Sequence, residues 1–493
     1  MSTPADTAVF ALIAHKIGPF QFDVGFGAVN ASIRDQIVRA QMIVRGIAAI
    51  IPSEKYRTKE RPLLICGAGI AGLAAATEAD RLGLAFIMID KHGFPSGALA
   101  GKGQRYVSPT MYEWPADGFD AHRHPPANGA FLDAEQDTGF PLNFTSPVTI
   151  EVVCDVLTNQ VLPHLTNWKD CAAQEKPGPW YLPYTRIAPS TKDDLQALLE
   201  SPTGDGAMLT LPPIMLNGPD ADQWVHVDWI IFAGGFAAEE TTYAGKDFKT
   251  PPFWSQDDLA QAHFGMKGVL RVSAFIAGAG DGAIQDALRC LVCEAAPEPI
   301  MIWKALLPDP APQGVDALLN KILSLEQYCS TAFMWSGRKE VFESIDAAHA
   351  DLARELLTLV PDITRKLSDI LRRDVERVHI QRNRAYFTRC YPLNRFLIHL
   401  VKTVLDAGAD VPDLSSRLCP QLTFGQGEVA SADLSSGATL GSYVWKGHTY
   451  HRVVVRTGAN NKGHAYQTIS LTGINPARTH FGRIPPPFVP AKK

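Results

Sequence analysis

Three glycines and one carboxylate early in the chain have the types and the spacing needed to bind a dinucleotide. An apolar run, residues 63–66, comes first, and Gly67, Gly69 and Gly72 follow it in a GxGxxG pattern. The first glycine permits a tight turn, the second lets the backbone approach a pyrophosphate, and the third lets a helix pack on the strand. Asp90 follows about 20 residues after Gly67, which is the separation expected for an acid that binds ribose hydroxyls.

The elements around these residues must bring them together. An Ala-rich helical stretch follows Gly72, Gly83 offers a stop, and a second apolar run (residues 84–89) ends at Asp90. This order predicts strand, turn, helix and strand, and the helix N-terminus would present N–H groups and partial positive charge to phosphates. The alternative is a glycine-rich turn in another α/β unit, where Asp90 only ends a strand. The expected ligand contacts here are Gly67, Gly69, Ile70, Ala71, Gly72, Asp90 and Lys91.

The same pattern recurs in the middle of the chain. The apolar run 274–277 leads into Gly278 and Gly280, and Ala283 takes the position of the third glycine. Alanine at that position still permits close packing of a helix on a strand. A helix is expected next, followed by a strand over residues 299–303. The pattern therefore predicts a second dinucleotide-binding unit.

Two charged residues distinguish this second unit. Asp281 places a carboxylate where phosphates should arrive, and we expect it to cap the new helix through the N–H groups of Gly282 and Ala283. Lys304, rather than an acid, ends the expected strand, and a cation there tolerates the extra phosphate of NADP, which favours NADPH over NADH. The alternative for Lys304 is a solvated surface side chain. The expected ligand contacts are Gly278, Gly280, Asp281, Gly282, Ala283 and Lys304.

The composition is that of an ordinary globular protein. The chain has 493 residues, of which 46% are hydrophobic and 20% charged, enough for two or three domains with large cores. A net charge of -5 and a pI near 6.3 give no sign of nucleic-acid binding. The sequence contains no apolar run long enough to span a membrane and no evident secretory signal, so we expect a cytoplasmic protein.

The cysteines and histidines suggest no metal or nucleophilic chemistry. The eight cysteines are scattered, as in a reduced protein. Cys290 and Cys293 form a CxxC within an expected helix, but no second ligand pair accompanies them, so packing is favoured over a redox or metal role. His122 and His124 also lack partners at a useful spacing, and no metal site is expected. Neither a nucleophile elbow nor an HExxH motif appears, so the sequence identifies no catalytic residue.

Several further segments are expected to form the rest of the fold. Residues 33–47 have the periodicity of an amphipathic helix that docks on the main body. A helix is also expected after residue 146, with Pro147 near its first turn. Residues 312–374 are strongly helical and would serve as a lid, a substrate wall or a dimer surface. Residues 376–391 alternate as a charged strand does, and residues 451–463 form a third strand-to-glycine element.

The order of these parts resembles the flavoproteins with two dinucleotide-binding domains, which include flavin-containing monooxygenases and thioredoxin reductase-like enzymes. The resemblance covers roughly residues 61–310 and, faintly, 376–463. In that family the first glycine motif binds FAD, and a strand ending in Ala-x-Gly leads to an NAD(P) domain. The segment DWIIFAGG, residues 228–235, stands in that place. The ending at residues 456–458, Arg-Thr-Gly, resembles the strand that returns to the FAD domain.

Two features depart from the family pattern. No cysteine lies between Cys66 and Cys154, so the redox pair of the disulfide reductases is missing and the monooxygenase layout fits better. A late Gly-Asp element, which in the family often contacts the flavin ribityl chain, is not recognisable after residue 458.

The aromatic loop at residues 101–114 occupies the position where such flavoproteins bring residues to the flavin ring. The resemblance implies that Arg105 reaches a phosphate or the flavin edge. It implies that Tyr106, Tyr112 and Trp114 cover the ring or line the substrate. The alternative is a packed loop of prolines and aromatic residues.

The resemblance implies an α/β fold with two Rossmann-like domains, one for FAD and one for NAD(P), plus a helical insertion. It implies an FAD-dependent oxidoreductase that takes hydride from NAD(P)H and acts on a small molecule, with monooxygenation as one chemistry. The alternatives are a flavin reductase or oxidase without oxygenation, and a sensor that binds FAD and NAD(P) without turnover. The expected segments are an N-terminal helical extension (1–60), the first part of the FAD domain (61–245), the first part of the NAD(P) domain (246–311), the helical insertion (312–375), and the return to both domains with the tail (376–493).

Overall fold

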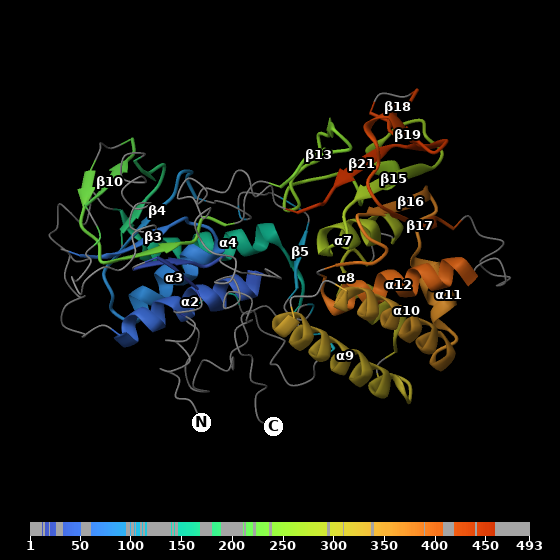
Figure 1. Cartoon of the computed structure of the whole chain (residues 1–493), viewed down its shortest axis with the longest axis horizontal. Coiled ribbons are helices and arrows are strands. Elements are labelled where there is room, and N and C mark those ends of the chain that lie inside the picture. The colour runs from blue at the N-terminus through green and yellow to red at the C-terminus, as the bar shows by residue number, and fades with distance from the viewer. Residues whose placement is uncertain are drawn as a thin grey trace. The chain divides into compact units, whose positions relative to one another are not determined.

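The chain folds into two compact units, which are described separately (Figure 1). Unit 1 comprises residues 1–109, 118–238 and 461–493, and unit 2 comprises residues 110–117 and 239–460. The computed structural model describes residues 33–50, 61–94, 146–167, 180–188, 223–235, 239–292, 296–308, 310–336, 340–388, 390–407, 419–438 and 441–458, with shorter stretches within 12–25, 99–115, 140–142 and 211–219.

Unit 1 is built on a mainly parallel sheet. Among the described residues the sheet has seven strands, and every neighbouring pair is parallel except β1 and β2. The buried apolar runs predicted around the first glycine motif form two of its central strands. In spatial order the strands are β1 (Lys16–Gly18), β2 (Gln21–Asp23), β12 (Trp229–Phe232), β3 (Leu63–Cys66), β4 (Phe86–Ile89), β8 (Trp180–Leu182) and β7 (Thr166–Asn167).

Two helices pack together in unit 1, α2 (Ile33–Ile50) and α3 (Ile70–Arg81) (Figure 1). The expected periodicity of α2 is confirmed, since Ile37, Ile43 and Ile47 are fully buried. Glu78 of α3 is also fully buried, and Arg45 and Arg81 both bond to its carboxylate at 2.6 Å. A buried charge therefore joins the two helices without being left unpaired.

The opposite face of the sheet is covered by a small antiparallel sheet. It consists of β9 (Arg186–Ile187), β10 (Ile214–Asn217) and β11 (Gln223–Val225). Side chains from β10, such as Ile214 and Leu216, share one apolar cluster with Leu64 and Ile230 of the main sheet. The central strands of unit 1 are thus buried on both faces, as expected for parallel strands.

The remaining elements of unit 1 are short. Strands β5 (Tyr106–Val107) and β6 (Val148–Thr149) form an antiparallel pair, and α4 (Ile150–Gln160) follows, with the 3-10 turn η2 (Leu162–His164) after it. The expected helix is present, and Pro147 lies just before its N-cap. Thr149 is the N-cap, because its hydroxyl accepts a hydrogen bond from Val152 N.

Unit 2 contains a parallel sheet whose order is β17 (Gln421–Gln426), β16 (Val375–Arg382), β15 (Val272–Ala277) and β21 (Arg452–Val455). Helices α7 (Asp281–Leu291) and α12 (Pro392–Ala407) pack against it with a large apolar cluster. The meander β18 (Ser435–Ser436), β19 (Tyr443–Trp445) and β20 (His448–Tyr450) adds Trp445 and Tyr450 to a second cluster around Phe275. The short pieces η3 (Ala262–Gly265), η4 (Ser431–Asp433), β13 (Thr242–Tyr243) and β14 (Lys246–Asp247) complete the described part.

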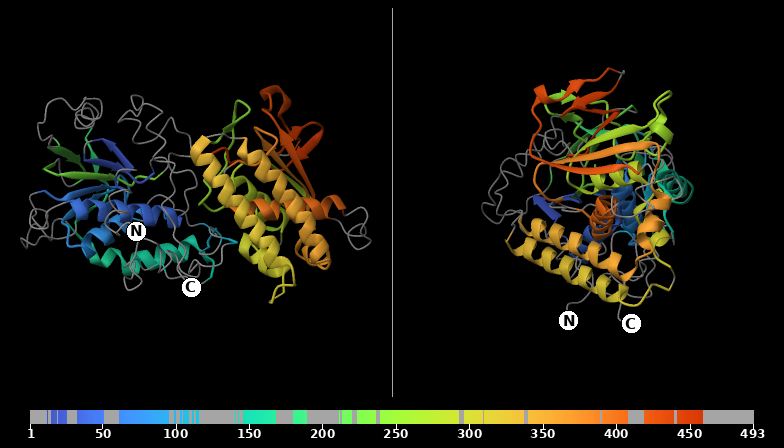
Figure 2. Two further views of the ribbon diagram at one scale, coloured as in Figure 1. Left: turned by 60° about the horizontal axis from the view of Figure 1, so that its bottom comes forward. Right: turned by 90° about the vertical axis from the view of Figure 1, so that its right-hand side faces the viewer.

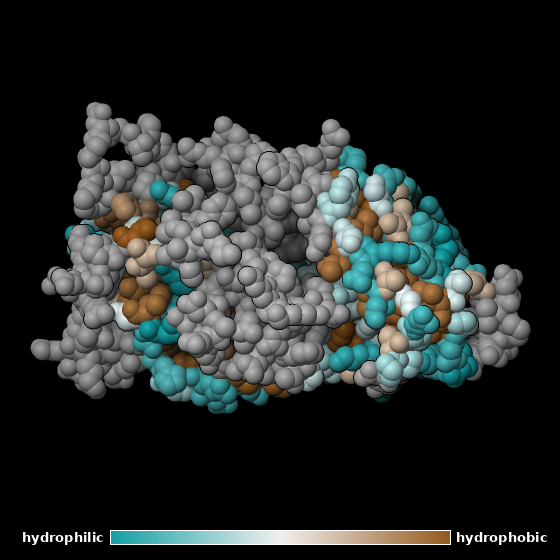
Figure 3. Space-filling view, turned by 90° about the horizontal axis from the view of Figure 1, so that it is seen from below, coloured by the Kyte–Doolittle hydropathy of each residue, from teal (hydrophilic) through white to brown (hydrophobic). Residues whose placement is uncertain are grey.

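Four helices lie between α7 and β16 in the sequence. They are α8 (Pro299–Leu306), α9 (Val315–Ser336), α10 (Val341–Leu359) and α11 (Ile363–Ile370). Helices α9 and α10 run side by side (Figure 2). Within the described residues no helix is long and apolar enough to cross a membrane, and hydrophilic side chains cover much of the described surface of unit 2 in Figure 3.

The strand predicted over residues 299–303 is wrong, because these residues begin α8. Glu298 is the N-cap and its carboxylate accepts a hydrogen bond of 2.9 Å from Ile300 N, while Pro299 occupies the first helical position. Both are helix start signals. The apolar run Pro-Ile-Met-Ile-Trp is largely buried, and a short buried run does not distinguish a strand from a helix by periodicity.

Candidate dinucleotide sites

Both sheets place their glycine motif at the same topological position. In unit 1 the order is β8, β4, β3, β12, and in unit 2 it is β17, β16, β15, β21. In each case the strand before the glycines has the next strand of the series on one side and a strand from much later in the chain on the other. The chain order therefore reverses beside β3 and beside β15, and ligands of such sheets bind outside the carboxyl ends of the strands at that point.

Gly67 and Gly72 are required by the packing of the turn in unit 1. Gly67 has φ 116°, and a Cβ there would lie 2.6 Å from the carbonyl oxygen of Ala233, the residue after β12. A Cβ on Gly72 would lie 1.7 Å from the carbonyl oxygen of Gly67. The tight turn and the close helix packing expected from the sequence are both present.

Gly69 is a glycine for a different reason. Its φ of -77° and ψ of -173° are open to any residue, so its own backbone conformation does not require glycine. It is the N-cap of α3 and offers no side-chain cap, and its carbonyl accepts the first helical bond from Leu73 N at 3.0 Å. The first N–H groups of α3, at Ile70, Ala71 and Gly72, lack intrahelical acceptors by geometry. This combination suits the approach of an anion.

Asp90 lies across the carboxyl edge, next to the glycine turn. Its Oδ2 accepts a 2.6 Å hydrogen bond from Ala68 N, and its Oδ1 accepts one of 2.7 Å from His92 N. The side chain is buried, with 7% exposure, whereas Lys91 is exposed. Asp90 is thus fixed beside Gly67 by two main-chain donors, and Lys91 lies beside it on the surface.

The turn in unit 2 repeats this geometry. Gly278 has φ 153°, and a Cβ there would lie 2.3 Å from the carbonyl oxygen of Arg456, the residue after β21. Ala283 lies where Gly72 lies in unit 1, and its Cβ is 3.1 Å from the Cβ position of Gly278. Gly280 is the N-cap of α7, with φ -114° and ψ -170°, again a conformation that any residue can adopt. In both turns, therefore, the first glycine is required by the packing of the fold, whereas the N-cap glycine is not.

Asp281 does not cap α7, contrary to the sequence prediction. Its Oδ1 accepts hydrogen bonds from Tyr391 N at 2.6 Å and from Asn394 Nδ2 at 2.9 Å, so the carboxylate serves the start of α12. Gly280 holds the N-cap position instead. Burial raises the pKa of Asp281 to about 7, against the opposing effect of the hydrogen bond from Tyr391. Gly282 packs near Phe253 and Arg456, each of which lies 3.4 Å from its Cβ position.

Lys304 is not at the end of a strand. It is exposed in the last turn of α8. The strand next to β15 is β16, and the described residues at its carboxyl end include Arg382 and Arg384. Arg382 is buried over the Phe387 and Phe424 rings, at 4.8 Å from each, and 3.7 Å from Asp346. Arg384 is exposed, and its guanidinium donates to Tyr386 Oη at 2.8 Å.

The helices between β15 and β16 explain why the sequence does not predict a role for Arg384. The strand expected from the alternating segment ERVHIQRNRAY is confirmed as β16. Five helices, α7 to α11, lie between β15 and this strand along the chain, so the sequence does not assign it to the sheet of β15. Its hydrophobic alternation and its charged end are the signals that could identify it.

The residues of the aromatic loop are divided between the two units. Arg105 is buried in unit 1, and its carbonyl accepts a hydrogen bond of 2.9 Å from Ile150 N at the start of α4. Tyr106 is half-buried in β5. Trp114 belongs to unit 2, where it lies 5.1 Å from Trp303 and 5.7 Å from Phe396 in the apolar core. The expectation of a ring-covering or substrate-lining role for Trp114 is therefore replaced by core packing, and Tyr112 lies outside the described residues.

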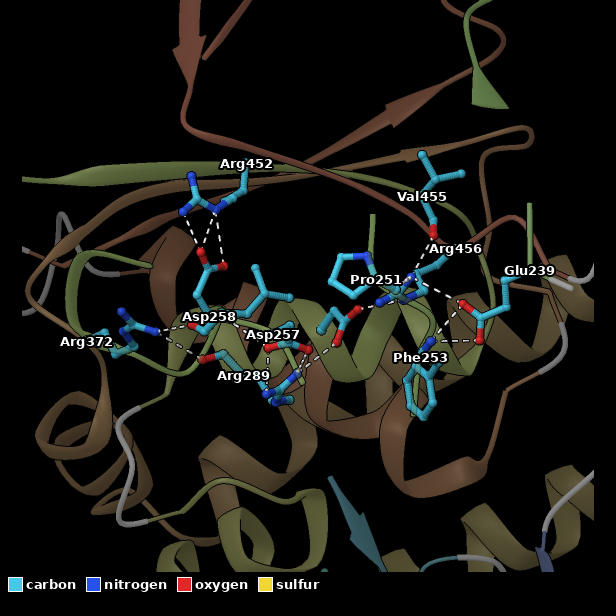
Figure 4. A network of polar contacts seen from close by, with 12 residues as sticks. Glu239, Pro251, Phe253, Asp257, Asp258, Arg289, Arg372, Arg452, Val455 and Arg456 are labelled. Carbon is cyan, nitrogen blue, oxygen red and sulfur yellow. Dashed lines mark hydrogen bonds and ion pairs between the residues drawn. The ribbon is translucent and has the colours of Figure 1, made fainter. Parts of the chain in front are cut away.

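A group of arginines, absent from the sequence prediction, holds the second turn in place (Figure 4). Arg456 donates from Nε to Asp286 of α7 at 2.8 Å and from its Nη1 to Pro251 O at 3.0 Å. Arg289 binds Asp257 with two hydrogen bonds of 2.8 and 2.9 Å. Both arginines are buried. The segment before β15 is thus tied to α7 and to the end of β21, the two elements that flank Gly278.

The cysteines give no redox or metal site among the described residues. The six described cysteines are free, and no group of three metal-binding side chains is present in that part of the chain. Cys290 lies near the end of α7, and burial raises the pKa of its thiol. Cys293, His122 and His124 lie outside the described residues.

No family model matches the chain, and no curated protein matches it. Solved structures do resemble it. Bacillithiol disulfide reductase from Staphylococcus aureus is 9% identical, with a TM-score of 0.36 over 84% of this chain and 81% of the other. Cyclohexanone monooxygenase from Rhodococcus sp., bound to NADP+, is 11% identical, with a TM-score of 0.34 over 83% and 73%.

An ornithine N-hydroxylase from Kutzneria sp. 744, with reduced FAD, NADP+ and L-ornithine, is 13% identical, with a TM-score of 0.29 over 81% and 80%. These three solved structures are named as a disulfide reductase, a monooxygenase and an N-hydroxylase.

Proposed function

We propose that the chain is an FAD-dependent oxidoreductase that takes hydride from NAD(P)H, with FAD bound at the turn of unit 1 and the nicotinamide nucleotide at the turn of unit 2. The observation that carries the proposal is the repeated geometry at the two points of chain reversal. At each turn the backbone requires one glycine, and a second glycine, whose conformation any residue could adopt, is the N-cap of a helix. The order of the two ligands along the chain follows the flavoproteins that the sequence resembles.

The residues present in unit 1 fit an FAD molecule. Asp90 would accept hydrogen bonds from the ribose hydroxyls, because main-chain N–H groups hold its carboxylate beside the glycine turn, at the end of the second strand where such an acid binds ribose. Gly69 and the start of α3 would receive the pyrophosphate, together with Ile70 and Ala71. Lys91 and Arg105 are the proposed cationic contacts. A bound flavin would supply the hydride acceptor, and the protein would hold and orient it.

The residues present in unit 2 fit NADPH better than NADH. Gly278, Gly280 and Ala283 would hold the pyrophosphate against α7. Asp281 is turned toward α12, which removes its charge from the immediate start of α7. An exposed Arg384 follows the strand where an acid would favour the unphosphorylated ribose, and an arginine suits a phosphate.

The substrate is proposed to be a small molecule, with monooxygenation as the leading chemistry. The reason is the spacing of Cys66 and Cys154, which leaves no redox cysteine pair after the first turn for disulfide reduction. Product analysis under oxygen, with a count of the peroxide released, separates a monooxygenase from an oxidase.

Purified full-length protein, mixed with FAD and freed of excess, tests the proposal. We expect a flavin absorption spectrum with near-stoichiometric FAD, and consumption of NADPH in air. Protein that retains no flavin would overturn the proposal. Protein that retains flavin but never oxidises NADPH or NADH with any acceptor would instead support a nucleotide-binding sensor.

A further inference from the structure

An N-terminal strand reaches the same edge of the sheet as the first glycine turn. Strand β2 lies parallel to β12, with Asp23 in register with Phe232. Phe232 is in register with Cys66, and Cys66 with Ile89. Since neighbouring strands are ~4.8 Å apart, Asp23 lies roughly 10 Å from Cys66, on the side away from Ile89 and Asp90. The turn thus has a carboxylate on each side of it.

Asp23 is a buried carboxylate with few donors. Its exposure is 5%, and among the described residues its side chain accepts one hydrogen bond, from Gly25 N to Oδ1 at 2.8 Å. Burial raises the pKa of Asp23 to about 7, and the Gly25 hydrogen bond only partly opposes this. A buried carboxylate normally has several donors or a cation beside it. Asp23 therefore has capacity for further hydrogen bonds.

Gln21 adds a second polar group on the same face of β2, two residues before Asp23. It is fully buried, and within the described part of the chain neither its Oε1 nor its Nε2 has a hydrogen-bond partner. Buried amides are seldom left unpaired, because the loss of their hydrogen bonds to water is then not compensated. Among the described residues, the face of β2 that includes Asp23 is therefore short of hydrogen-bond partners.

The main chain of β2, by contrast, is firmly held. His15 Nδ1 lies 3.0 Å from Asp23 O, and Arg39 donates to His15 Nε2 at 3.3 Å. Burial lowers the pKa of His15 to about 3, so the ring is neutral and donates from Nδ1 while it accepts at Nε2. These contacts fix the position of the strand and leave the Asp23 carboxylate at the edge.

We infer that β2 completes the FAD site of unit 1, with Asp23 accepting hydrogen bonds from hydroxyl groups in the flavin half of FAD, beyond the pyrophosphate. This inference rests on the proposed function. Asp90 would bind the adenosine half of FAD, and Asp23 would bind the ribityl chain of the flavin half. The two carboxylates lie on opposite sides of the turn that would receive the pyrophosphate. Residues that precede the glycine motif would thereby take part in cofactor binding.

Comparing FAD with ADP tests this directly, because ADP contains the adenosine half and lacks the sugar-alcohol chain. We would measure both affinities by calorimetry on full-length, flavin-free protein. Asp23→Asn should weaken FAD binding about tenfold to hundredfold, since hydrogen bonds to the carboxyl group are lost, and should leave ADP binding unchanged. Asp90→Asn should weaken both. Asp228→Asn is the matched control, because Asp228 lies at the opposite edge of the same sheet, where Arg61 binds it at 2.9 Å.

Equal FAD affinity in the wild type and Asp23→Asn overturns the inference while the proposed function stands. Equal losses of FAD and ADP in Asp23→Asn assign Asp23 a structural role only, which also overturns it. Wild-type protein that binds no FAD overturns the proposed function and this inference with it. The asparagine keeps the acceptor for Gly25 N, and a matching thermal unfolding profile would verify that the variant folds.

Discussion

At the scale of single residues, the two turns separate glycines that the fold needs from glycines that only the proposed nucleotides would need. Gly67 and Gly278 adopt positive φ and approach the main chain of a neighbouring strand, so no other residue fits. Gly69 and Gly280 have ordinary extended angles. Glycines of the same motif are therefore present for different physical reasons, and single substitutions can test these reasons.

Gly69→Ala and Gly67→Ala form a matched pair. Gly69→Ala should change the free energy of unfolding by less than about 1 kcal/mol, because its φ suits any residue, yet should weaken FAD binding roughly tenfold or more. Gly67→Ala should destabilise unit 1 by at least ~2 kcal/mol through strain and the clash with Ala233 O. Denaturant unfolding and calorimetry measure the two effects. A Gly69→Ala protein with wild-type FAD affinity would contradict the assignment.

Arg384→Gln tests the nucleotide preference. We expect about tenfold to hundredfold weaker NADPH binding, with NADH binding changed little, because a charged hydrogen-bond donor to a phosphate is lost. Lys304→Gln is the control, and it should alter neither affinity, since Lys304 is exposed at the end of α8. If instead Lys304→Gln weakened NADPH binding and Arg384→Gln did not, the expectation drawn from the sequence would be restored.

Glu298→Gln tests the effect of a buried carboxyl on stability. Burial raises the pKa of Glu298 from 4.5 to about 7. The folded state therefore keeps the proton in a pH range where the unfolded chain has lost it, so wild-type stability should fall as pH rises from about 4.5 to about 7. Glutamine keeps an acceptor for Ile300 N and has no charge to lose. The variant should be up to ~3 kcal/mol more stable than the wild type at pH 8 and similar to it at pH 4. Thermal unfolding at the two pH values measures this, and identical pH profiles would refute it.

At the scale of elements, the first unit is largely predictable from sequence and the second only in part. The predicted strand, turn, helix and strand around Gly67 are present because all of their signals are local: an apolar run, three glycines and an acid. In unit 2 the predictions of the turn and of α7 are confirmed. The pairing of β16 with β15 is not predictable, because strand pairing across five intervening helices leaves no local signal.

The contribution of the N-terminus escapes sequence reasoning for a similar reason. Residues 16–23 form two very short strands without a clear alternation, and their place in the sheet depends on pairing with β12, which comes much later in the chain. The buried ion pairs of unit 2 are also beyond sequence reasoning, because Asp286 and Arg456 come together only when α7 and β21 pack on the same sheet.

The Asp286–Arg456 pair should be a main support of the second turn. Asp286→Ala removes a fully buried carboxylate that both Arg456 and Arg289 contact, and it leaves Arg456 with Glu239 at 3.3 Å, so unit 2 should lose about 3 kcal/mol of stability. Asp258→Ala removes a partly exposed partner of Arg452 and should cost about 1 kcal/mol or less. Unfolding of the two variants provides the comparison. Equal losses would mean that burial does not set the strength of these pairs.

At the scale of the whole molecule, the chain repeats one arrangement in two units. Each has a parallel sheet in which the glycine motif follows a central strand and faces a strand from later in the chain. Two such turns in one chain favour a protein that brings two nucleotides into one reaction, and this is the central claim of the proposed function.

Anaerobic titration of the FAD-reconstituted full-length protein with NADPH tests that claim most directly. The account predicts that the flavin absorption band is bleached, with one NADPH oxidised for each FAD bound, and that NADH does the same less efficiently. Protein that binds FAD firmly yet keeps an unchanged flavin spectrum in the presence of excess NADPH and NADH would contradict it.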